Sequence, residues 1–241
     1  MKIKIDLSPN HSSKIRKKNK IKFVIIHYTG MQSEIESIKR LKDLKSKVSC
    51  HYLINRKGVV TQMVYDNQAS WHAGKSKWKS FKNLNEHSLG IELVNEGHEF
   101  RYQNFPNSQI TSLIKLCKFF KKKYKIENIN FLGHSDIAPL RKLDPGEKFP
   151  WKKLSNYNLG TWYRLQKKNF IQINGKNIRK LFFKNLYKIG YRYFKINKKS
   201  LSDKFIIKAF QQRYNPKKIT GKIDLKTFKI SHFLVNKLKT T

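Results

Sequence analysis

The chain has 241 residues, of which 39% are hydrophobic and 13% are aromatic, and its formal net charge is +38. This length allows one large domain or two unequal ones, and the apolar content is enough to build a core, which excludes a wholly disordered chain. No apolar run approaches the length of a membrane-spanning helix, so we expect no transmembrane segment.

The excess of positive charge has three candidate explanations. Phosphates attract Lys and Arg, so a nucleic acid is one candidate partner, and another polyanion, such as a cell-wall polymer or an anionic lipid, is a second. The third is biased composition, because the basic residues are mostly Lys and are spread along the whole chain among many Ile and Asn. Since the chain has no RRM, KH, zinc-finger or basic-zipper signature, we expect no dedicated nucleic-acid partner.

The N-terminal part begins with a basic stretch and continues into a strand and a helix. Residues 1–20 are rich in Lys and predict a basic arm. Residues 21–30 form a run of β-branched and aromatic side chains, which is typical of a buried strand. Ser33 and Glu36 have the spacing of a capping box and predict the start of a helix. The apolar side chains of this helix that fall on one face are Ile35, Ile38 and Leu41.

The middle of the chain alternates strand and helix patterns. Residues 50–64 predict a hairpin that turns at 56–58, and residues 87–95 predict another strand. An amphipathic helix is predicted over 108–126, followed by a short strand over 128–134. The alternation indicates an α/β fold with a mixed central sheet flanked by helices.

The pattern changes after residue 162. Residues 176–241 contain three helical patterns, and turn signals at Gly190, Pro216 and Gly221 separate them. We therefore predict a small three-helix C-terminal domain, joined to a first domain over 21–162 by a linker over 163–175.

Polar residues at predicted strand ends indicate a metal site. His27 and His134 each close a strand, and Asp144 follows in a loop braced by Pro and Gly. Two imidazoles and a carboxylate are a common ligand set for catalytic zinc, which keeps one coordination position for water. Asp136 is a competing carboxylate, but it is only two residues from His134, and we expect it to brace the loop through turn hydrogen bonds.

Five segments in chain order resemble a known family. They are "FVIIHYTG", "CHYLINRKGVVTQMV", "SWHAG", "HSLGIELVN" and "GHSDIAPLRKLDPGEKFPW". Together they resemble the zinc-dependent N-acetylmuramoyl-L-alanine amidases of the type-2 family, the AmpD/AmiD group, and the resemblance covers residues 20–155. The later segment "IIKAFQQRYNPKKITGKIDLKTFKIS" resembles a peptidoglycan-binding three-helix domain through Phe210, Gln211, Gly221 and Asp224.

The resemblance implies specific roles for residues of this chain. The zinc ligands would be His27, His134 and Asp144, with Glu92 as the catalytic glutamate and Lys142 as the cation that faces the reacting carbonyl. The residues expected to line the substrate groove are Trp71, His72 and Asn95. Glu92 also stands out independently, because a carboxylate inside the apolar run "LGIELV" is costly unless it has a partner or a task.

One position departs from the family pattern. Some relatives place a catalytic Tyr just before the residue that matches His51, whereas this chain has Cys50 there. The departure argues against a Tyr-assisted mechanism and gives Glu92 more of the proton transfer. We expect Cys50 to be a small buried residue, as free Cys usually is, and His51 to pack at the start of its strand.

We therefore expect a zinc-dependent enzyme that hydrolyses the amide bond between N-acetylmuramic acid, or its 1,6-anhydro form, and L-alanine in peptidoglycan or muropeptides. A peptidoglycan-binding protein without activity is the alternative. Because no signal peptide is visible and the two Cys residues form no disulfide framework, we expect a cytoplasmic protein, or a periplasmic or secreted one if an export signal was removed. A monomer is the favoured oligomeric state.

Overall fold

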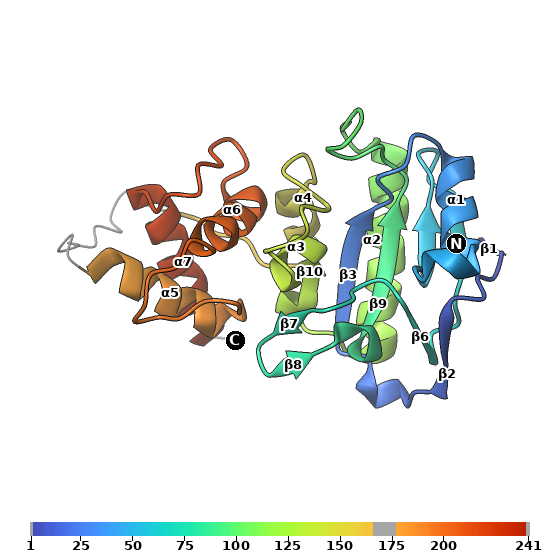
Figure 1. Cartoon of the computed structure of the whole chain (residues 1–241), viewed down its shortest axis with the longest axis horizontal. Coiled ribbons are helices and arrows are strands. Elements are labelled where there is room, and N and C mark those ends of the chain that lie inside the picture. Colours follow the sequence, from blue (N-terminus) through green and yellow to red (C-terminus); the bar gives the residue numbers. More distant parts are fainter. Residues whose placement is uncertain (1, 166–176, 240–241) are drawn as a thin grey trace.

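The computed structural model describes residues 2–165 and 177–239. Figure 1 shows a mixed central sheet flanked by helices, with a group of helices beside it, so the predicted α/β fold class is confirmed. Most of the linker predicted over 163–175 lies outside the described residues, and the domain boundaries remain a prediction. None of the described helices is long and apolar enough to span a membrane.

The central sheet has six strands. In spatial order they are β1 (Ile3–Ile5), β5 (Val60–Gln62), β4 (Tyr52–Ile54), β9 (Ser88–Leu93), β3 (Phe23–Tyr28) and β10 (Phe131–Gly133). The β4–β5 pair is the antiparallel hairpin predicted over 50–64, and the other neighbouring strands run parallel. The strands predicted around residues 25, 90 and 131 are β3, β9 and β10, and all three are confirmed.

Helix α2 (Asn107–Tyr124) covers one face of this sheet (Figure 1). The five side chains that its amphipathic pattern predicts as inward are buried: Ile110, Leu113, Ile114, Cys117 and Phe120. They pack against apolar side chains of β3 and β9, such as Val24, Ile26 and Leu89. This packing leaves the opposite face of the sheet for other residues.

Helix α1 (Glu34–Lys42) begins where the capping pattern predicts, because the Ser33 hydroxyl accepts a hydrogen bond from the Glu36 amide at 3.1 Å. Leu41 is buried and Ile38 packs beside it, but Ile35 is 79% exposed. Residues spaced by three drift around a helix of 3.6 residues per turn, so the first of the three leaves the core.

The N-terminal residues do not form the arm that their charge predicts. Strand β1 pairs with the edge strand β5, and β2 (His11–Ile15) pairs antiparallel with β6 (Gln68–Ser70). The Arg16 side chain is buried and donates to three backbone carbonyls, those of Asp66, Asn85 and Ser88. The prediction of a basic arm was wrong because pairing with distant strands is not visible in local charge.

Several short elements complete the part of the fold around the sheet. Strands β7 (Lys77–Trp78) and β8 (Phe81–Lys82) form a small hairpin. Two short helices follow β10, and they are α3 (His134–Ile137) and α4 (Trp151–Ser155). Short 3₁₀ turns span Lys18–Lys20, Leu44–Ser46, Leu84–His87 and Asn128–Asn130.

Three helices occupy the described residues after the linker, as predicted. They are α5 (Ile178–Ile189), α6 (Asp203–Tyr214) and α7 (Leu225–Lys239). We call them the helical region. They share one apolar cluster with the sheet, in which Phe182 and Phe210 lie with Ile25 and Leu132. The contact is close, because a Cβ atom on Gly190 would lie 2.3 Å from the Trp78 ring.

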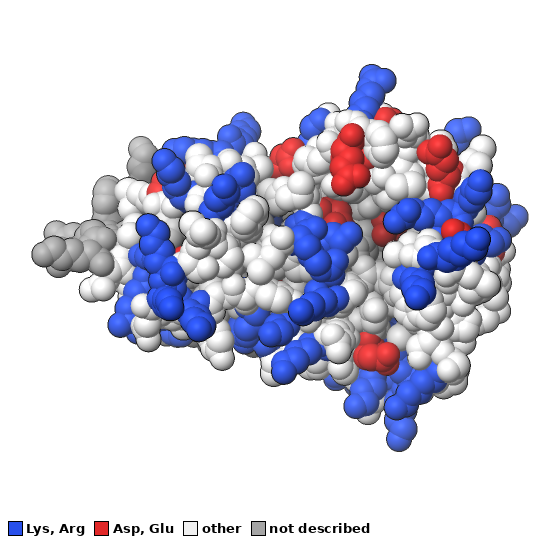
Figure 2. Space-filling model, in the orientation of Figure 1, with Lys and Arg blue, Asp and Glu red and all other residues white. Residues whose placement is uncertain are grey.

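Basic side chains are distributed over both parts of the molecule. On the face in Figure 2, Lys and Arg lie over the sheet and over the helical region alike, and Asp and Glu are fewer. The charge is therefore not confined to one element on this face.

Candidate active site

The face of the sheet opposite α2 carries the polar residues. In β9, the residues 88, 90 and 92 are Ser, Gly and Glu, whereas 89, 91 and 93 are Leu, Ile and Leu. Alternate side chains of a strand point to opposite faces. His27 of β3 is the register partner of Glu92, so both side chains leave the sheet on the same face.

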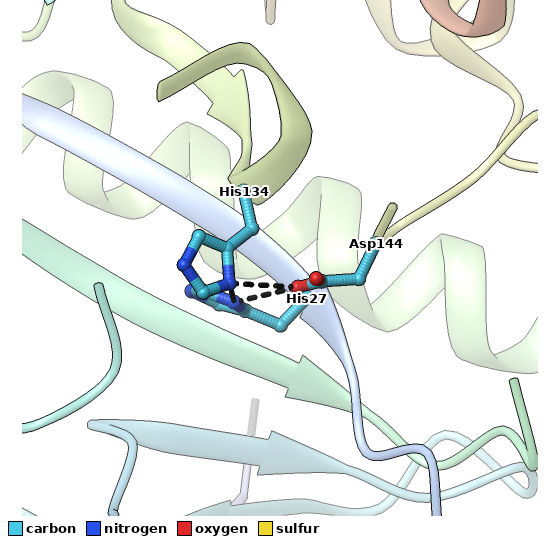
Figure 3. A group of neighbouring side chains, drawn as sticks. All are labelled: His27, His134 and Asp144. Atoms are coloured by element: carbon cyan, nitrogen blue, oxygen red, sulfur yellow. Dashed lines mark hydrogen bonds and ion pairs between the residues drawn. The ribbon is translucent and has the colours of Figure 1, made fainter. Parts of the chain in front are cut away.

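Three residues from different segments meet on this face. The Nδ1 atom of His27 lies 2.9 Å from Asp144 Oδ2, and the Nδ1 atom of His134 lies 3.1 Å from the same oxygen. The two Nδ1 atoms are 3.0 Å apart. Figure 3 shows the three side chains turned toward one another, and one ligand atom from each lies within 4.8 Å of the others. The structure thus brings together all three residues predicted as ligands.

Local backbone contacts explain why Asp144 reaches this place. His134 begins the short helix α3 directly after β10, and the chain then loops back. The Ser135 amide donates to the Asp144 carbonyl at 2.9 Å, which holds the end of the loop beside the start of the helix. His134 and Asp144 are ten residues apart in sequence, and the loop brings them into direct contact.

The charges of these groups suit a metal ion. Burial and the neighbouring His134 lower the pKa of His27 to about 4, so its imidazole is neutral at pH 7. Burial opposes ionisation of Asp144, but the His134 and His27 imidazoles outweigh it and hold the pKa of this carboxyl well below its usual value. A neutral imidazole and an ionised carboxylate are the forms that bind a divalent cation.

A chain of hydrogen bonds behind His27 defines its tautomer. If Nδ1 faces the ligand cluster, the proton is on Nε2, which lies 3.0 Å from His72 Nδ1. His72 then carries its own proton on Nε2, which lies 3.0 Å from the Ser88 hydroxyl. Ser88 donates in turn to the Leu84 carbonyl. Outer partners of this kind orient metal-binding imidazoles and raise their basicity.

Small residues on β9 leave space for this series of hydrogen bonds. A Cβ atom on Gly90 would lie 2.3 Å from the His72 ring, so any larger residue would displace the imidazole. Burial, with the neighbouring His27 and His51 rings, holds the pKa of His72 well below its ordinary value, so the ring is neutral. Gly90, the small residue in the segment "LGIEL", is therefore required by the close approach of the His72 ring.

The second imidazole has an acceptor of its own. The Nε2 atom of His134 lies 3.2 Å from the Ala73 carbonyl. Arg141 Nη2 lies at the same distance from Nε2. If Nδ1 faces His27 and Asp144 as a ligand, the proton is on Nε2 and donates to the Ala73 carbonyl. Both imidazoles therefore present the same ring nitrogen to the cluster.

Glu92 has the environment of a reactive carboxyl. Its Oε2 atom is buried and has no hydrogen-bond partner among the described residues. Burial, reinforced by the charge of Asp144, raises the pKa of Glu92 well above its ordinary value. Buried polar groups are nearly always satisfied in folded proteins, so an unpaired carboxyl next to a ligand cluster indicates a functional group.

A groove opens beside the cluster. It has a volume of about 330 Å³. Its wall includes Asp144 and Lys142, together with Arg40, Glu96 and Glu99. The charge of Lys142 acts on both His27 and Glu92, which agrees with a cation facing the same space.

Two residues predicted to line the substrate groove have other tasks. Asn95 is 2% exposed, its amide nitrogen donates to the Gln103 carbonyl at 2.8 Å, and its oxygen accepts from the Gly97 amide at 3.2 Å. His72 is buried under His27, as described above. The polar atoms of both side chains are engaged inside the fold, and their place in substrate binding remains a prediction. Trp71 is 36% exposed, and its place in substrate binding remains a prediction.

Three further expectations can be compared with the structure. Asp136 stays outside the ligand cluster and accepts from the Gly133 amide at 2.8 Å, so its bracing role is confirmed. Cys50 is buried, and the Cys50 thiol lies 3.9 Å from the Met63 sulfur. His51 is also buried, with its Nδ1 atom 2.9 Å from the Gly90 amide.

The contacts of Arg16, His72 and Ser88 around the site were not apparent from the sequence. The polar and small residues that alternate along β9 were a usable signal for Ser88, because they mark a face that is not packed with apolar side chains. No local pattern indicated the contacts of Arg16, whose partners are distant in the chain.

Known amidases resemble this chain in sequence. The family model described as N-acetylmuramoyl-L-alanine amidase matches residues 17–147. The N-acetylmuramoyl-L-alanine amidase AmiD of Escherichia coli is 33% identical over 233 residues, which cover 90% of this chain and 83% of that protein. The 1,6-anhydro-N-acetylmuramyl-L-alanine amidase AmpD of Haemophilus influenzae is 40% identical over 108 residues, 44% of this chain and 56% of that protein.

A solved structure shares nearly the whole fold. The structure of E. coli AmiD in complex with the substrate anhydro-N-acetylmuramic acid-L-Ala-D-γ-Glu-L-Lys superimposes with a TM-score of 0.81 at 31% identity, covering 94% of this chain and 92% of that one. Since the family model matches more than half of the residues and AmiD is matched over most of its length, this chain belongs to the N-acetylmuramoyl-L-alanine amidase family.

Proposed function

We propose that this amidase uses zinc to hydrolyse the amide bond between N-acetylmuramic acid, or its 1,6-anhydro form, and L-alanine in peptidoglycan or muropeptides. The proposal is supported most by the convergence of His27, His134 and Asp144. The names of the relatives and the substrate bound to AmiD support the choice of bond.

The donor set is suited to zinc. Two neutral imidazole nitrogens and one carboxylate oxygen are ligands that zinc takes in catalytic sites, with one position left for water. When bound, zinc polarises a carbonyl and lowers the pKa of coordinated water to about 7. With Nδ1 bound to the metal, His27 Nε2 would donate to His72 and His134 Nε2 would donate to the Ala73 carbonyl.

Glu92 is the proton carrier in this proposal. Its carboxyl lies on the ligand-bearing face and is free of other hydrogen bonds among the described residues. A raised pKa makes the ionised Glu92 carboxylate a stronger base. In its ionised form, Glu92 takes a proton from the attacking water and delivers it to the leaving amine nitrogen.

Lys142 supplies positive charge from the groove wall. It stabilises the negative charge that develops on the carbonyl oxygen as water attacks. Removing one such stabilising group typically reduces the rate about a hundred- to a thousandfold.

The helical region is proposed to contact the cell-wall polymer. This proposal depends on the sequence resemblance, because the residues that carry it have structural tasks. The Gln211 side chain accepts from the Thr220 and Gly221 amides at 2.9 Å, and the Asp224 carboxylate accepts from the Thr227 amide at 2.7 Å. These residues hold the connection between α6 and α7 and so define the architecture of the region.

Digestion of purified muropeptides tests the proposed reaction. The wild-type protein is expected to release the stem peptide with a free L-alanine amino terminus, identified by mass. A chelator should stop the release, and added zinc should restore it. Intact substrate in the presence of stoichiometric zinc would instead favour a peptidoglycan-binding protein without activity.

A further inference from the structure

The helical region reaches the backbone that carries His134. Residues 131–136 comprise β10 and the beginning of α3, whose first residue is His134. Arg213, at the end of α6, donates from Nη2 to the Phe131 carbonyl at 2.9 Å and from Nη1 to the Asp136 carboxylate. The Tyr191 hydroxyl, just after α5, donates to the other Asp136 oxygen. Two side chains of the helical region therefore hold positions on both sides of a metal ligand.

Asp136 connects these two side chains to the start of α3. Its Oδ2 atom also accepts from the Gly133 amide, the residue immediately before His134. Helix α3 has only four residues, and its N-cap residue Gly133 has no side chain to cap it. The orientation of this turn therefore depends on Asp136 and on the groups that hold Asp136 in place.

The contact is buried. Asp136 is 1% exposed, Arg213 is 3% exposed and Tyr191 is fully buried. The Arg213 guanidinium also lies 4.0 Å from the centre of the Trp151 ring. Removing one member of a buried ion pair leaves the other without compensation for its lost hydration. We therefore expect the Asp136 carboxylate to shift when Arg213 is absent, even though Tyr191 and the Gly133 amide still contact it.

We propose that Arg213 and Tyr191 are positioning residues for the metal ligand His134, so that the helical region sets the affinity of the active site for its metal. The inference rests on the proposed function only in requiring that His27, His134 and Asp144 bind zinc. Through Asp136 and the Phe131 carbonyl, the two side chains hold the backbone from which the His134 imidazole projects. A purely stabilising contact would make a different prediction, because it would change the melting temperature without changing the metal site.

Arg213→Met tests the inference in the full-length protein, with Arg179→Met as the matched control. Arg179 pairs with the buried Asp203 at 2.7 Å inside the helical region. Asp203 lies ten residues before Arg213 on α6, a separation of about 15 Å along a helix. Both variants remove an Arg–Asp pair, but only one of these pairs touches the backbone around His134.

The measurements are zinc affinity by competition with a chromophoric chelator, the absorption spectrum of the Co²⁺-substituted protein, and the melting temperature. Arg213→Met should weaken zinc binding about 10- to 100-fold, as changes to outer partners of metal ligands do, and should shift the Co²⁺ spectrum. Arg179→Met should lower the melting temperature and leave the zinc affinity and the spectrum unchanged. Tyr191→Phe, which removes only one hydroxyl, should weaken zinc binding in the same direction by a smaller factor.

Unchanged zinc affinity and an unchanged Co²⁺ spectrum in folded Arg213→Met would overturn the inference while leaving the proposed function intact. If Arg213→Met does not fold, Tyr191→Phe decides by the same criterion. Equal losses of affinity in Arg213→Met and Arg179→Met would also overturn it, since the effect would then follow stability alone. A wild-type protein that binds no zinc would overturn the proposed function, and the inference with it.

Discussion

The two faces of the central sheet use the same strands for different purposes. On the face covered by α2, residues such as Ile26, Leu89 and Ile91 exclude water and contribute stability. On the opposite face, the alternate positions of the same strands carry His27 and Glu92. Neighbouring residues of one strand are therefore expected to fail in different ways, one by unfolding and the other by loss of chemistry.

The largest effect is expected on the ligand face. His134→Ala should abolish zinc binding and amide hydrolysis together, because it removes one of three protein ligands. Metal content by elemental analysis and product release by mass measure the two losses. His232→Ala changes a histidine of α7 that pairs with Asn236, and it should retain both properties. If His134→Ala retained zinc and turnover, His134 would not be a zinc ligand, and the ligand-bearing face would not differ in function from the face covered by α2.

Glu92→Gln should separate chemistry from metal binding. The amide cannot accept a proton, so the rate should fall about 10²- to 10⁴-fold, the range of general acid–base catalysis. Zinc content should stay at the wild-type value, since Glu92 is not among the three clustered ligands. Glu127→Gln, at an exposed position, serves as the control. Loss of zinc in Glu92→Gln would show that the residue is a ligand.

On the α2 face, Phe120→Ala should destabilise the fold by about 3–5 kcal/mol, as truncation of a buried aromatic side chain does. The neighbouring Phe119 is 50% exposed, whereas Phe120 is fully buried, so Phe119→Ala is a matched control with a much smaller effect. Denaturant unfolding measures both. Below its melting temperature, folded Phe120→Ala should keep the zinc affinity of the wild type, and a specific loss of affinity would contradict the separation of the two faces.

Substitution of His72 tests whether a residue behind the metal ligands contributes to zinc affinity. His72→Phe removes the acceptor for His27 Nε2 and should weaken zinc binding about 10- to 100-fold. His72→Asn keeps an acceptor oxygen near the position of Nδ1 and should recover part of that affinity. Competition with a chelator ranks the zinc affinities of the wild type, His72→Asn and His72→Phe. Equal affinities for the two variants would mean that the ring fills space and does not orient His27.

The smallest effect is expected at the start of α1. Ser33→Ala removes the acceptor for the Glu36 amide and should lower the free energy of unfolding by about 1 kcal/mol, the usual contribution of a helix N-cap. Activity and zinc content should not change. An unaltered denaturation midpoint would show that the cap contributes nothing to the stability of the folded state.

Much of the fold was predictable because it depends on local patterns. The alternation in β9, the period of α2 and the cap of α1 all arise from contacts within one element, so neighbouring residues suffice to reveal them. The same holds for the three helices after residue 176. The N-terminal strands escaped prediction, because β1 and β2 are held by pairing with β5 and β6, and their Lys-rich sequence gives no sign of those partners.

The site was predictable as a set of residues but not as an arrangement. His27, His134 and Asp144 were identified as ligands, and the structure brings them together. Asn95 and His72 were assigned to the substrate groove from their place in the family pattern. Their actual tasks depend on which polar atoms lie within hydrogen-bond distance after folding, and a linear pattern does not contain that information.

By itself, the sequence determined the α/β class, the residue types of the ligand cluster and the membership of an amidase family, because residue type and spacing carry those properties. Only the tertiary structure decided which side chains support the ligands. His27 meets Asp144 across 117 residues, and Arg213 meets Asp136 across 77. Such contacts form when the chain collapses around a shared core, and their geometry depends on the packing of all the elements between them.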